Sequence, residues 1–316
     1  MENMTKLSVI IPAYNVAGYI EKTLQSVLNQ TFEGYEIVVV DDGSSDETGA
    51  ICDRYAENNT QITVIHQKNG GVMAARLKGF EISKGEWVTF LDGDDRFPSD
   101  SLQLLYDTAV SKDVDLVWGT RAIIDDNNIV LHKVNESIVG YFDNKKYTKY
   151  ICAHPRSLHG MLFRRSVISE SVVVDRRITN GEDQLFNLFI SNRIQHAYSI
   201  PDVVHFYINR SDSATKQKLR DDYWYLFISY VGDCYKKYGV GEFTYRLFIL
   251  TRVNSIIRNC EINCSHACFD KLKNFQYSSY YGIKANLILF VLKHPIPFFI
   301  RILRMHPTRF FKKKWM

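Results

Sequence analysis

Residues 87–95 read WVTFLDGDD, an apolar run that favours a buried β-strand, followed at once by three carboxylates. Packing these negative charges at the end of a strand costs free energy unless a cation neutralises them. Hard divalent ions such as Mg²⁺ and Mn²⁺ take oxygen ligands, so either ion would suit this stretch. A solvated turn is the alternative interpretation, because Asp and Gly are common turn residues.

Strands and helices alternate four times over the residues up to this stretch. The expected strands cover residues 7–12, 35–40, 62–66 and 87–91, with helical patterns between them. This order predicts an α/β fold with a mostly parallel, Rossmann-like sheet flanked by helices. Loops at the carboxyl ends of parallel strands form the ligand crevice of such sheets, so residues 13–15, 41–43 and 92–95 should gather at one edge.

The second half of the chain predicts a change in organisation. Residues 100–215 mix helix and strand, whereas the pattern from residue 216 is helical and aromatic. We therefore expect an α/β domain over residues 1–215 and a helical C-terminal region over residues 216–316. Glu182 and Asp183 open a predicted helix. They either complement the helix dipole or supply a catalytic carboxylate.

The composition indicates a folded, reduced protein. Hydrophobic residues make up 46% of the chain and aromatic residues 13%, which excludes a disordered composition. The six cysteines show no disulfide framework, and the first residues lack the features of a signal peptide. Both observations favour the cytoplasm as the expected location.

The basic residues are concentrated at the C-terminal end. Ten of the 39 Lys and Arg residues, and no acidic residue, lie from Lys271 onward. They alternate with Phe, Ile, Leu and Trp, a pattern typical of peripheral contact with the inner face of a membrane. An amphipathic helix packed on the protein, with a solvated basic face, is the alternative. The apolar run 287–292 is too short to span a bilayer, and the interleaved apolar residues speak against nucleic acid as a partner.

Four segments together resemble the family 2 glycosyltransferases of the GT-A fold. The resemblance is dense over residues 6–100 and looser to about residue 215, and it is carried by residues 8–15, 30–46, 69–95 and 181–183. It implies an inverting enzyme that moves a hexose or N-acetylhexosamine from a UDP-sugar, such as UDP-galactose or UDP-glucose, to a glycan hydroxyl. It also implies Mn²⁺ or Mg²⁺, and a bacterial surface glycan, lipid-linked oligosaccharide or glycoprotein as acceptor.

The resemblance assigns roles to particular residues. Those expected at the nucleotide or its phosphates are Pro12, Ala13, Tyr14, Asn15, Asp41, Asn69, Gly70, Gly71, Arg76, Asp92 and Gly93. Asp92, Asp94 and His205 are the expected metal ligands; for His205 the competing interpretation, a structural histidine, is favoured because an isolated His carries little signal. Asp183 is the expected general base. His159 is expected on the acceptor side. Leu77 stands where the family usually has Asn, and Gly93 where it often has Ser.

Two other functions compete with a sugar transferase. A non-catalytic nucleotide-sugar-binding or scaffold protein could retain the fold, although the retained carboxylates speak against it. A NAD-dependent dehydrogenase is disfavoured, because no Gly-x-Gly-x-x-Gly follows the first strand.

Overall fold

The computed structural model describes residues 5–125, 129–134, 138–154, 156–168, 172, 174–209 and 223–258. The chain divides into two compact units, residues 1–148 with 156–217 (unit 1) and residues 149–155 with 218–316 (unit 2). A compact unit need not be an independent folding domain, so the predicted boundary between residues 215 and 216 stays a prediction. The basic tail from Lys271 lies outside the described residues.

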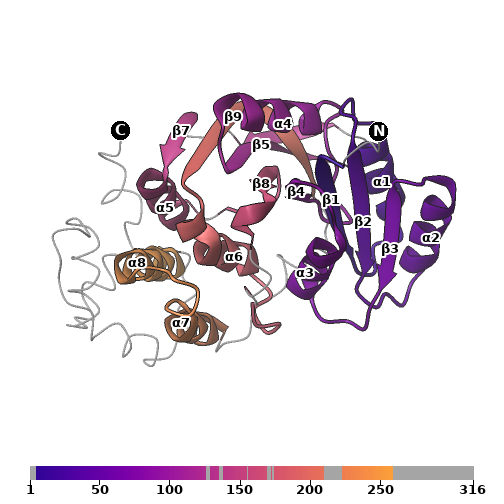
Figure 1. Cartoon of the computed structure of the whole chain (residues 1–316). Helices are drawn as coiled ribbons and strands as arrows, with labels where there is room; N and C mark the ends of the chain where they lie inside the picture. The colour runs from indigo at the N-terminus through magenta and orange to yellow at the C-terminus, as the bar shows by residue number, and fades with distance from the viewer. Residues whose placement is uncertain are drawn as a thin grey trace. The chain divides into compact units, whose positions relative to one another are not determined.

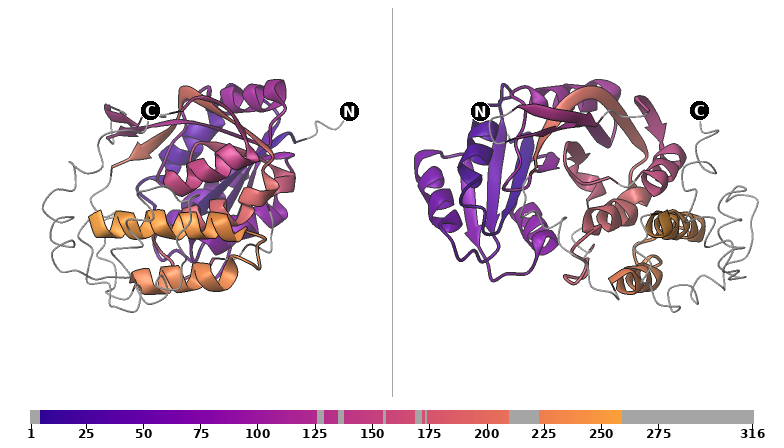
Figure 2. Two further views of the ribbon diagram at one scale, coloured as in Figure 1. Left: turned by 90° about the vertical axis from the view of Figure 1, so that its left-hand side faces the viewer. Right: turned by 180° about the vertical axis from the view of Figure 1, so that it is seen from behind.

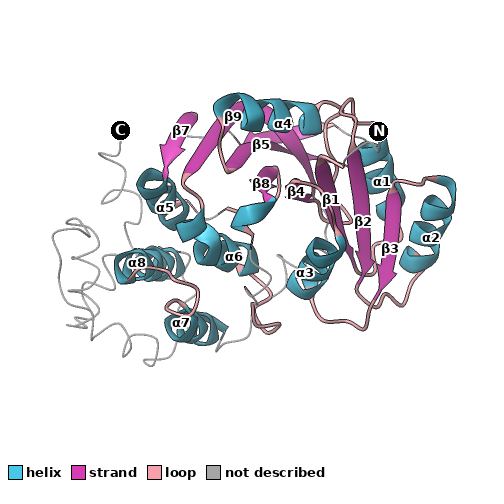
Figure 3. Ribbon diagram, viewed as in Figure 1, coloured by secondary structure: helices cyan, strands magenta, loops and turns pink. Residues whose placement is uncertain are grey.

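The strands of unit 1 form one sheet (Figures 1 and 3). Within the described residues they are β1 (Leu7–Ala13), β2 (Tyr35–Asp41), β3 (Ile62–His66), β4 (Trp87–Phe90), β5 (Leu116–Ile124), β6 (Val130–Val134), β7 (Gly140–Asp143), β8 (Met161–Arg164) and β9 (His196–Ile208). The sheet runs in the order β3-β2-β1-β4-β8-β5-β9-β7, with β6 paired to β5.

Helices connect the strands and continue into unit 2. They are α1 (Ile20–Leu28), α2 (Thr48–Asn58), α3 (Val72–Ile82), α4 (Ser101–Lys112), α5 (Asn144–Ala153), α6 (Glu182–Ile190), α7 (Tyr223–Cys234) and α8 (Glu242–Arg258). Two 3₁₀ turns, η1 (Arg165–Val167) and η2 (Ser191–Arg193), follow β8 and α6. The predicted α/β architecture, a Rossmann-like sheet flanked by helices, is confirmed.

The pairing of strands differs between the two halves of the sheet. The strands β1, β2, β3 and β4 are all parallel, as their continuous apolar runs predict. In the second half β8 pairs antiparallel with both β4 and β5, and β7 pairs antiparallel with β9. The sheet is therefore mixed, because the later connections return strands in the opposite direction.

Helices cover both faces of the sheet (Figure 2). One face of β1 packs with α1, α2 and α4 in a core that includes Val9, Leu24, Cys52 and Leu105. The other face carries α3 and α6, and α3 approaches so closely that a Cβ on Gly79 would lie 2.4 Å from a methyl group of Ile10. The N-terminal end of α3 lies near the carboxyl end of β2, where Gly70 and Gly71 bond to Asp42.

Unit 2 has its own apolar contacts. Phe227 of α7 and Phe248 of α8 stack with ring centroids 6.3 Å apart, and the hydroxyl of Thr251 donates to the carbonyl of Cys152 at 2.7 Å. Among the described residues, none of the helices combines the length and apolar character that crossing a membrane requires.

Candidate active site

The end of β1 joins the loops that follow β2 and β4. The carbonyl oxygen of Ala13 accepts from the backbone N–H of Asp42 at 2.8 Å, and that of Pro12 accepts from Gly93 at 3.2 Å. A Cβ on Gly93 would lie 3.2 Å from the Pro12 oxygen, so glycine suits this close approach. The structure thus brings three of the predicted loops to one edge of the sheet.

The predicted nucleotide-binding side of this edge is built by the β1 and β2 loops. Asn15 adopts a left-handed backbone conformation with φ of 50°. Its side-chain oxygen accepts from the backbone of Ser45 at 2.8 Å, while its own N–H donates to the Ser44 hydroxyl at 3.0 Å. Tyr14 beside it is half exposed, and Asp41 is 6% exposed. The arrangement leaves an aromatic face in solvent next to a buried carboxylate.

Asp42 fixes the loop that contains Asn69, Gly70 and Gly71. One carboxylate oxygen accepts from the N–H of Gly70 at 2.8 Å, and the other accepts from the N–H of Gly71 at 2.8 Å. Gly71 has φ of 91° and precedes the first residue of α3. These contacts set the direction in which α3 leaves the sheet edge, and Arg76 lies on its second turn.

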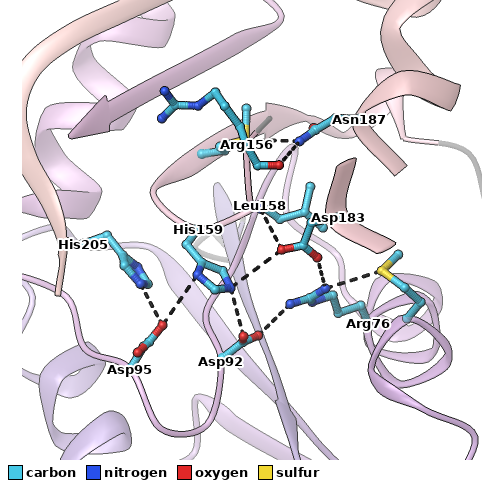
Figure 4. Close-up of polar contacts among 11 residues, drawn as sticks. Arg76, Asp92, Asp95, Arg156, Leu158, His159, Asp183, Asn187 and His205 are labelled. Atoms are coloured by element: carbon cyan, nitrogen blue, oxygen red, sulfur yellow. Dashed lines mark hydrogen bonds and ion pairs between the residues drawn. The ribbon is translucent and has the colours of Figure 1, made fainter. Parts of the chain in front are cut away.

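Arg76 connects the loop after β4 with the start of α6 (Figure 4). One terminal nitrogen donates to Asp183 Oδ1 at 2.5 Å and the other donates to Asp92 Oδ1 at 2.7 Å. The Arg76 side chain is only 1% exposed; the Asp183 side chain is 12% exposed and the Asp92 side chain 27%, so the pair with Asp183 is the more buried of the two. Arg76 was expected at the nucleotide or its phosphates; in the structure its partners are the two carboxylates.

Three carboxylates gather directly after β4. One oxygen from each of Asp92, Asp94 and Asp95 lies within 4.8 Å of the others, and only Asp95 is buried. Burial by itself would raise the pKa of Asp92, but the charges of Arg76 and His159 outweigh burial and hold it well below its usual value. This all-oxygen group has the donor chemistry that Mg²⁺ and Mn²⁺ prefer.

Asp95 is tied to β9. Its Oδ1 accepts from the N–H of Ile208 at 3.0 Å, and its Oδ2 lies 2.9 Å from Nε2 of His205. Burial lowers the pKa of His205 more than the Asp95 carboxylate raises it, so the imidazole is neutral at pH 7. His205 is fully buried in this pair. Its role as a metal ligand stays a prediction; one ligand atom each of His205, Asp95 and His159 lies within 4.8 Å of the others.

His159 lies among three carboxylates. Its Nε2 is 2.9 Å from Asp92 Oδ2 and 4.0 Å from Asp183 Oδ2, and its Nδ1 is 3.6 Å from Asp95 Oδ2. Burial lowers the pKa of His159, but Asp92 and the other two carboxylates overcome that effect and raise it to about 9. The ring is therefore an imidazolium at neutral pH. It stacks on His205 with centroids 4.9 Å apart.

Asp183 lies in the first turn of α6, after Gly181, which has φ of 92°. Its Oδ2 accepts from the N–H of Leu158 at 3.2 Å, and the positive end of the helix dipole faces the carboxylate. Burial and the neighbouring Asp183 raise the pKa of Glu182 to about 7. The turn therefore presents two carboxylates, of which Asp183 is the one in direct contact with Arg76.

Sequence reasoning missed two members of this cluster as functional neighbours. In the sequence Asp95 is one of three similar carboxylates after the predicted strand. Its hydrogen bonds to β9 join residues 110 and 113 positions apart, which the sequence pattern does not reveal. His159 was expected only on the acceptor side, because an isolated histidine has no periodic or motif signal. His159 lies just before β8 in the chain. Its position beside Asp92 therefore depends on the antiparallel pairing of β8 with β4.

Comparison with known proteins identifies the family. Residues 8–172 match the model of glycosyl transferase family 2. The glycosyltransferase GlyG of Streptococcus pneumoniae serotype 4 is 36% identical over 123 residues, which cover 39% of this chain and 41% of GlyG. The uncharacterized glycosyltransferase EpsJ of Bacillus subtilis is 27% identical over 223 residues, which cover 66% of this chain and 63% of EpsJ. The matches span less than two thirds of either relative.

A solved structure shares the fold. The crystal structure of residues 1–349 of S. aureus TarS in complex with UDP-GlcNAc aligns with a TM-score of 0.73 at 17% identity. The alignment covers 98% of this chain and 94% of the TarS chain. At this identity the likeness concerns the fold alone. Since the family model covers more than half of the sequence and the fold agrees, the chain belongs to glycosyl transferase family 2.

Proposed function

We propose that this chain is an inverting, metal-dependent glycosyltransferase that moves a hexose or N-acetylhexosamine from a UDP-sugar to a hydroxyl of a glycan acceptor. The observation that carries the proposal is the double ion pair of Arg76, which joins Asp92 after β4 to Asp183 at the start of α6. A carboxylate suited to holding a cation beside the donor diphosphate and a carboxylate suited to proton abstraction thus lie on either side of one guanidinium.

The donor is proposed to lie across the ends of β1 and β2. Tyr14 offers an exposed aromatic face and Asp41 offers a buried acceptor, a combination suited to stacking and to a hydrogen bond from a uracil N–H. The solved TarS complex contains UDP-GlcNAc, which supports a UDP-sugar as the donor class. The donors to test are UDP-galactose, UDP-glucose and the UDP-N-acetylhexosamines.

A divalent cation fits the acidic group after β4. Asp92 and Asp94 are the proposed ligands, because they are the less buried members of the group and Asp95 is committed to β9. When bound, Mn²⁺ or Mg²⁺ would neutralise the negative charge of the donor diphosphate. The all-oxygen donor set and the strongly depressed pKa of Asp92, which keeps it ionised, are the observations that favour this assignment.

Asp183 is proposed as the general base. A sugar hydroxyl is a weak nucleophile, so a carboxylate must accept its proton during attack on the anomeric carbon. Arg76 and the N–H of Leu158 hold the two oxygens of Asp183 in place and leave lone pairs for the acceptor hydroxyl. A single displacement from the face opposite the leaving UDP inverts the anomeric centre, and no enzyme nucleophile is needed.

The acceptor and the location are the most general parts of the proposal. We propose a lipid-linked oligosaccharide or a glycoprotein as the acceptor, with the enzyme in the cytoplasm and the basic tail in peripheral contact with the membrane. The tail lies outside the described residues, so this part of the proposal depends on its sequence of alternating basic and apolar residues.

The proposal is tested by following UDP release from each UDP-sugar with the full chain, in the presence of Mn²⁺, Mg²⁺ or EDTA. We expect metal-dependent UDP release from one donor class, by hydrolysis or by transfer to an added glycan. A chain that binds UDP but never releases it from any donor, with any acceptor, would instead be the non-catalytic nucleotide-sugar-binding protein.

Removing one proposed metal ligand gives a direct test of the acidic group. Asp94→Ala should weaken UDP binding in Mn²⁺ by at least about tenfold, the lower end of what loss of a supporting residue costs a metal site. Binding in EDTA should match that of the unaltered chain. Asp107→Ala, which removes an exposed carboxylate from α4, is the matched control. Calorimetry with both variants measures the effect, and an unchanged Mn²⁺ dependence in Asp94→Ala would remove Asp94 from the ligand set.

A further inference from the structure

A second row of charged side chains crosses the nucleotide side of the sheet edge. His66 Nδ1 lies 2.9 Å from Asp41 Oδ2, and His66 Nε2 lies 3.0 Å from Asp53 Oδ1. Asp41 and His66 end the neighbouring parallel strands β2 and β3 and are register partners, while Asp53 is on α2. The imidazole therefore links a buried carboxylate at the proposed nucleotide site to a carboxylate in solvent.

The contacts of Asp41 leave it little freedom. Its Oδ1 accepts from the N–H of Ser44 at 3.0 Å, so each oxygen already has a neighbouring donor. A Cβ added to Gly49 would lie 3.0 Å from Asp41 Oδ2 and 3.3 Å from Cε1 of His66, so α2 closes the space around the pair. Both the rotamer of Asp41 and the direction of its remaining lone pairs depend on the ring of His66.

We propose that His66, whose second ring nitrogen contacts Asp53, is a positioning residue for Asp41. The affinity for the donor nucleotide then depends on whether His66 is protonated. The inference rests on the proposed function, in which Asp41 accepts a hydrogen bond from the uracil. It adds a residue on β3 that does not itself touch the nucleotide.

The link follows from the number of donors on the ring. An imidazolium has two N–H groups and donates to both carboxylates, whereas a neutral imidazole has one and must leave one carboxylate facing a lone pair. The hydrogen bonds to Asp41 and then Asp53 raise the pKa of His66, and partial burial opposes them. The imidazolium therefore persists to a higher pH than that of a free histidine.

The titratable groups around His66 do not reverse the expected loss of Asp41 positioning at higher pH. Asp41 faces His66 from β2 and Asp53 faces it from α2. Cys52 lies near both carboxylates, and burial together with their charges raises the pKa of its thiol to about 12, so it stays neutral. Positioning of Asp41 is then complete below the pKa of His66 and weakens as the pH rises through it.

The test is calorimetry of UDP with the full chain between about pH 6 and pH 9, which brackets the ordinary imidazole pKa and a raised value. UDP changes its own charge in this range, so each variant is compared with the unaltered chain at the same pH. The unaltered chain should lose affinity relative to His66→Gln as the pH rises, by about three- to tenfold, the size of one hydrogen bond. The curve of UDP affinity against pH for His66→Gln should show no titration midpoint beyond that of UDP itself.

Two further variants separate positioning from a general loss of structure. Asp53→Asn should keep the pH dependence of UDP affinity but move its midpoint to lower pH, because only one of the two carboxylates that raise the pKa of His66 remains. His132→Gln, at an exposed histidine of β6, should behave as the unaltered chain. With an active donor, His66→Gln should raise the donor KM and leave kcat unchanged.

The outcomes distinguish this inference from the proposed function. If the unaltered chain binds UDP and His66→Gln retains its pH dependence, or loses affinity equally at every pH, His66 is not a positioning residue for Asp41, while the proposed function stands. If the unaltered chain does not bind UDP at any pH, the proposed donor and the inference built on it both fail.

Discussion

Asp183→Asn is expected to bind UDP as the unaltered chain does and to lose sugar transfer by about 10²–10⁴-fold, the usual contribution of a general base. Asparagine has nearly the same shape, and its side-chain oxygen can still accept from Leu158 or from Arg76. It cannot take a proton from an acceptor hydroxyl. The change should therefore appear in kcat and in UDP release, with little effect on the affinity for UDP.

The neighbouring carboxylate provides the control for this prediction. Glu182→Gln removes a charge from the same turn of α6, at a residue whose pKa of about 7 would itself suit proton transfer near neutral pH. We expect Glu182→Gln to retain most of the transfer rate. If Glu182→Gln loses activity and Asp183→Asn does not, the base has been assigned to the wrong member of the pair.

Arg76→Met is expected to produce the largest loss of stability. It removes the only guanidinium shown to contact Asp92 and Asp183 within the described residues. Breaking a buried ion pair by removing one partner costs about 3–5 kcal/mol, because a charge is left in a poorly solvated position. Here Asp92 and Asp183 lose their guanidinium partner at once, while His159 remains 2.9 Å from Asp92 and the N–H of Leu158 remains on Asp183. Urea unfolding, followed by circular dichroism, measures the change in the free energy of unfolding.

Adding Mn²⁺ tests whether the stability lost in Arg76→Met comes from unneutralised charge at the acidic group. A cation at the acidic group would neutralise part of the charge that Arg76 leaves behind, so the loss in Arg76→Met should be smaller in Mn²⁺ than in EDTA. Arg177→Met is the control, because Arg177 forms an exposed ion pair with Asp175 and should have little effect in either condition. Equal unfolding midpoints for Arg76→Met and the unaltered chain would show that this ion pair does not stabilise the fold.

The parallel half of the fold was readable from the sequence because its signals are local. The continuous apolar runs of β1 and β2 and the polar residues directly after them predict buried strands that end at one edge. The later strands carry weaker signals. β9 contains Pro201 and Asp202, which usually mark a turn, yet it continues for thirteen residues because β5 pairs along most of its length.

The sequence predicted which residues belong to the candidate site better than it predicted which of them contact one another. The carboxylates after β4 and at the start of α6 could be expected to meet, since both positions have a topological or motif signal. The partners of Arg76 could not, because the sequence does not reveal which carboxylates a helix side chain reaches. The pairing of Asp41 with His66 likewise depends on the register between β2 and β3, which the sequence leaves open.

The contact between Asp95 and β9 has a consequence for repeated catalysis. If the proposed cation leaves with the product, mutual repulsion would push the adjacent carboxylates of this loop apart. The contacts of Asp95 with Ile208 and His205 hold this loop against β9 through the protein's own groups. We therefore expect the loop to keep its conformation between turnovers, so that little reorganisation energy is spent before the next donor arrives.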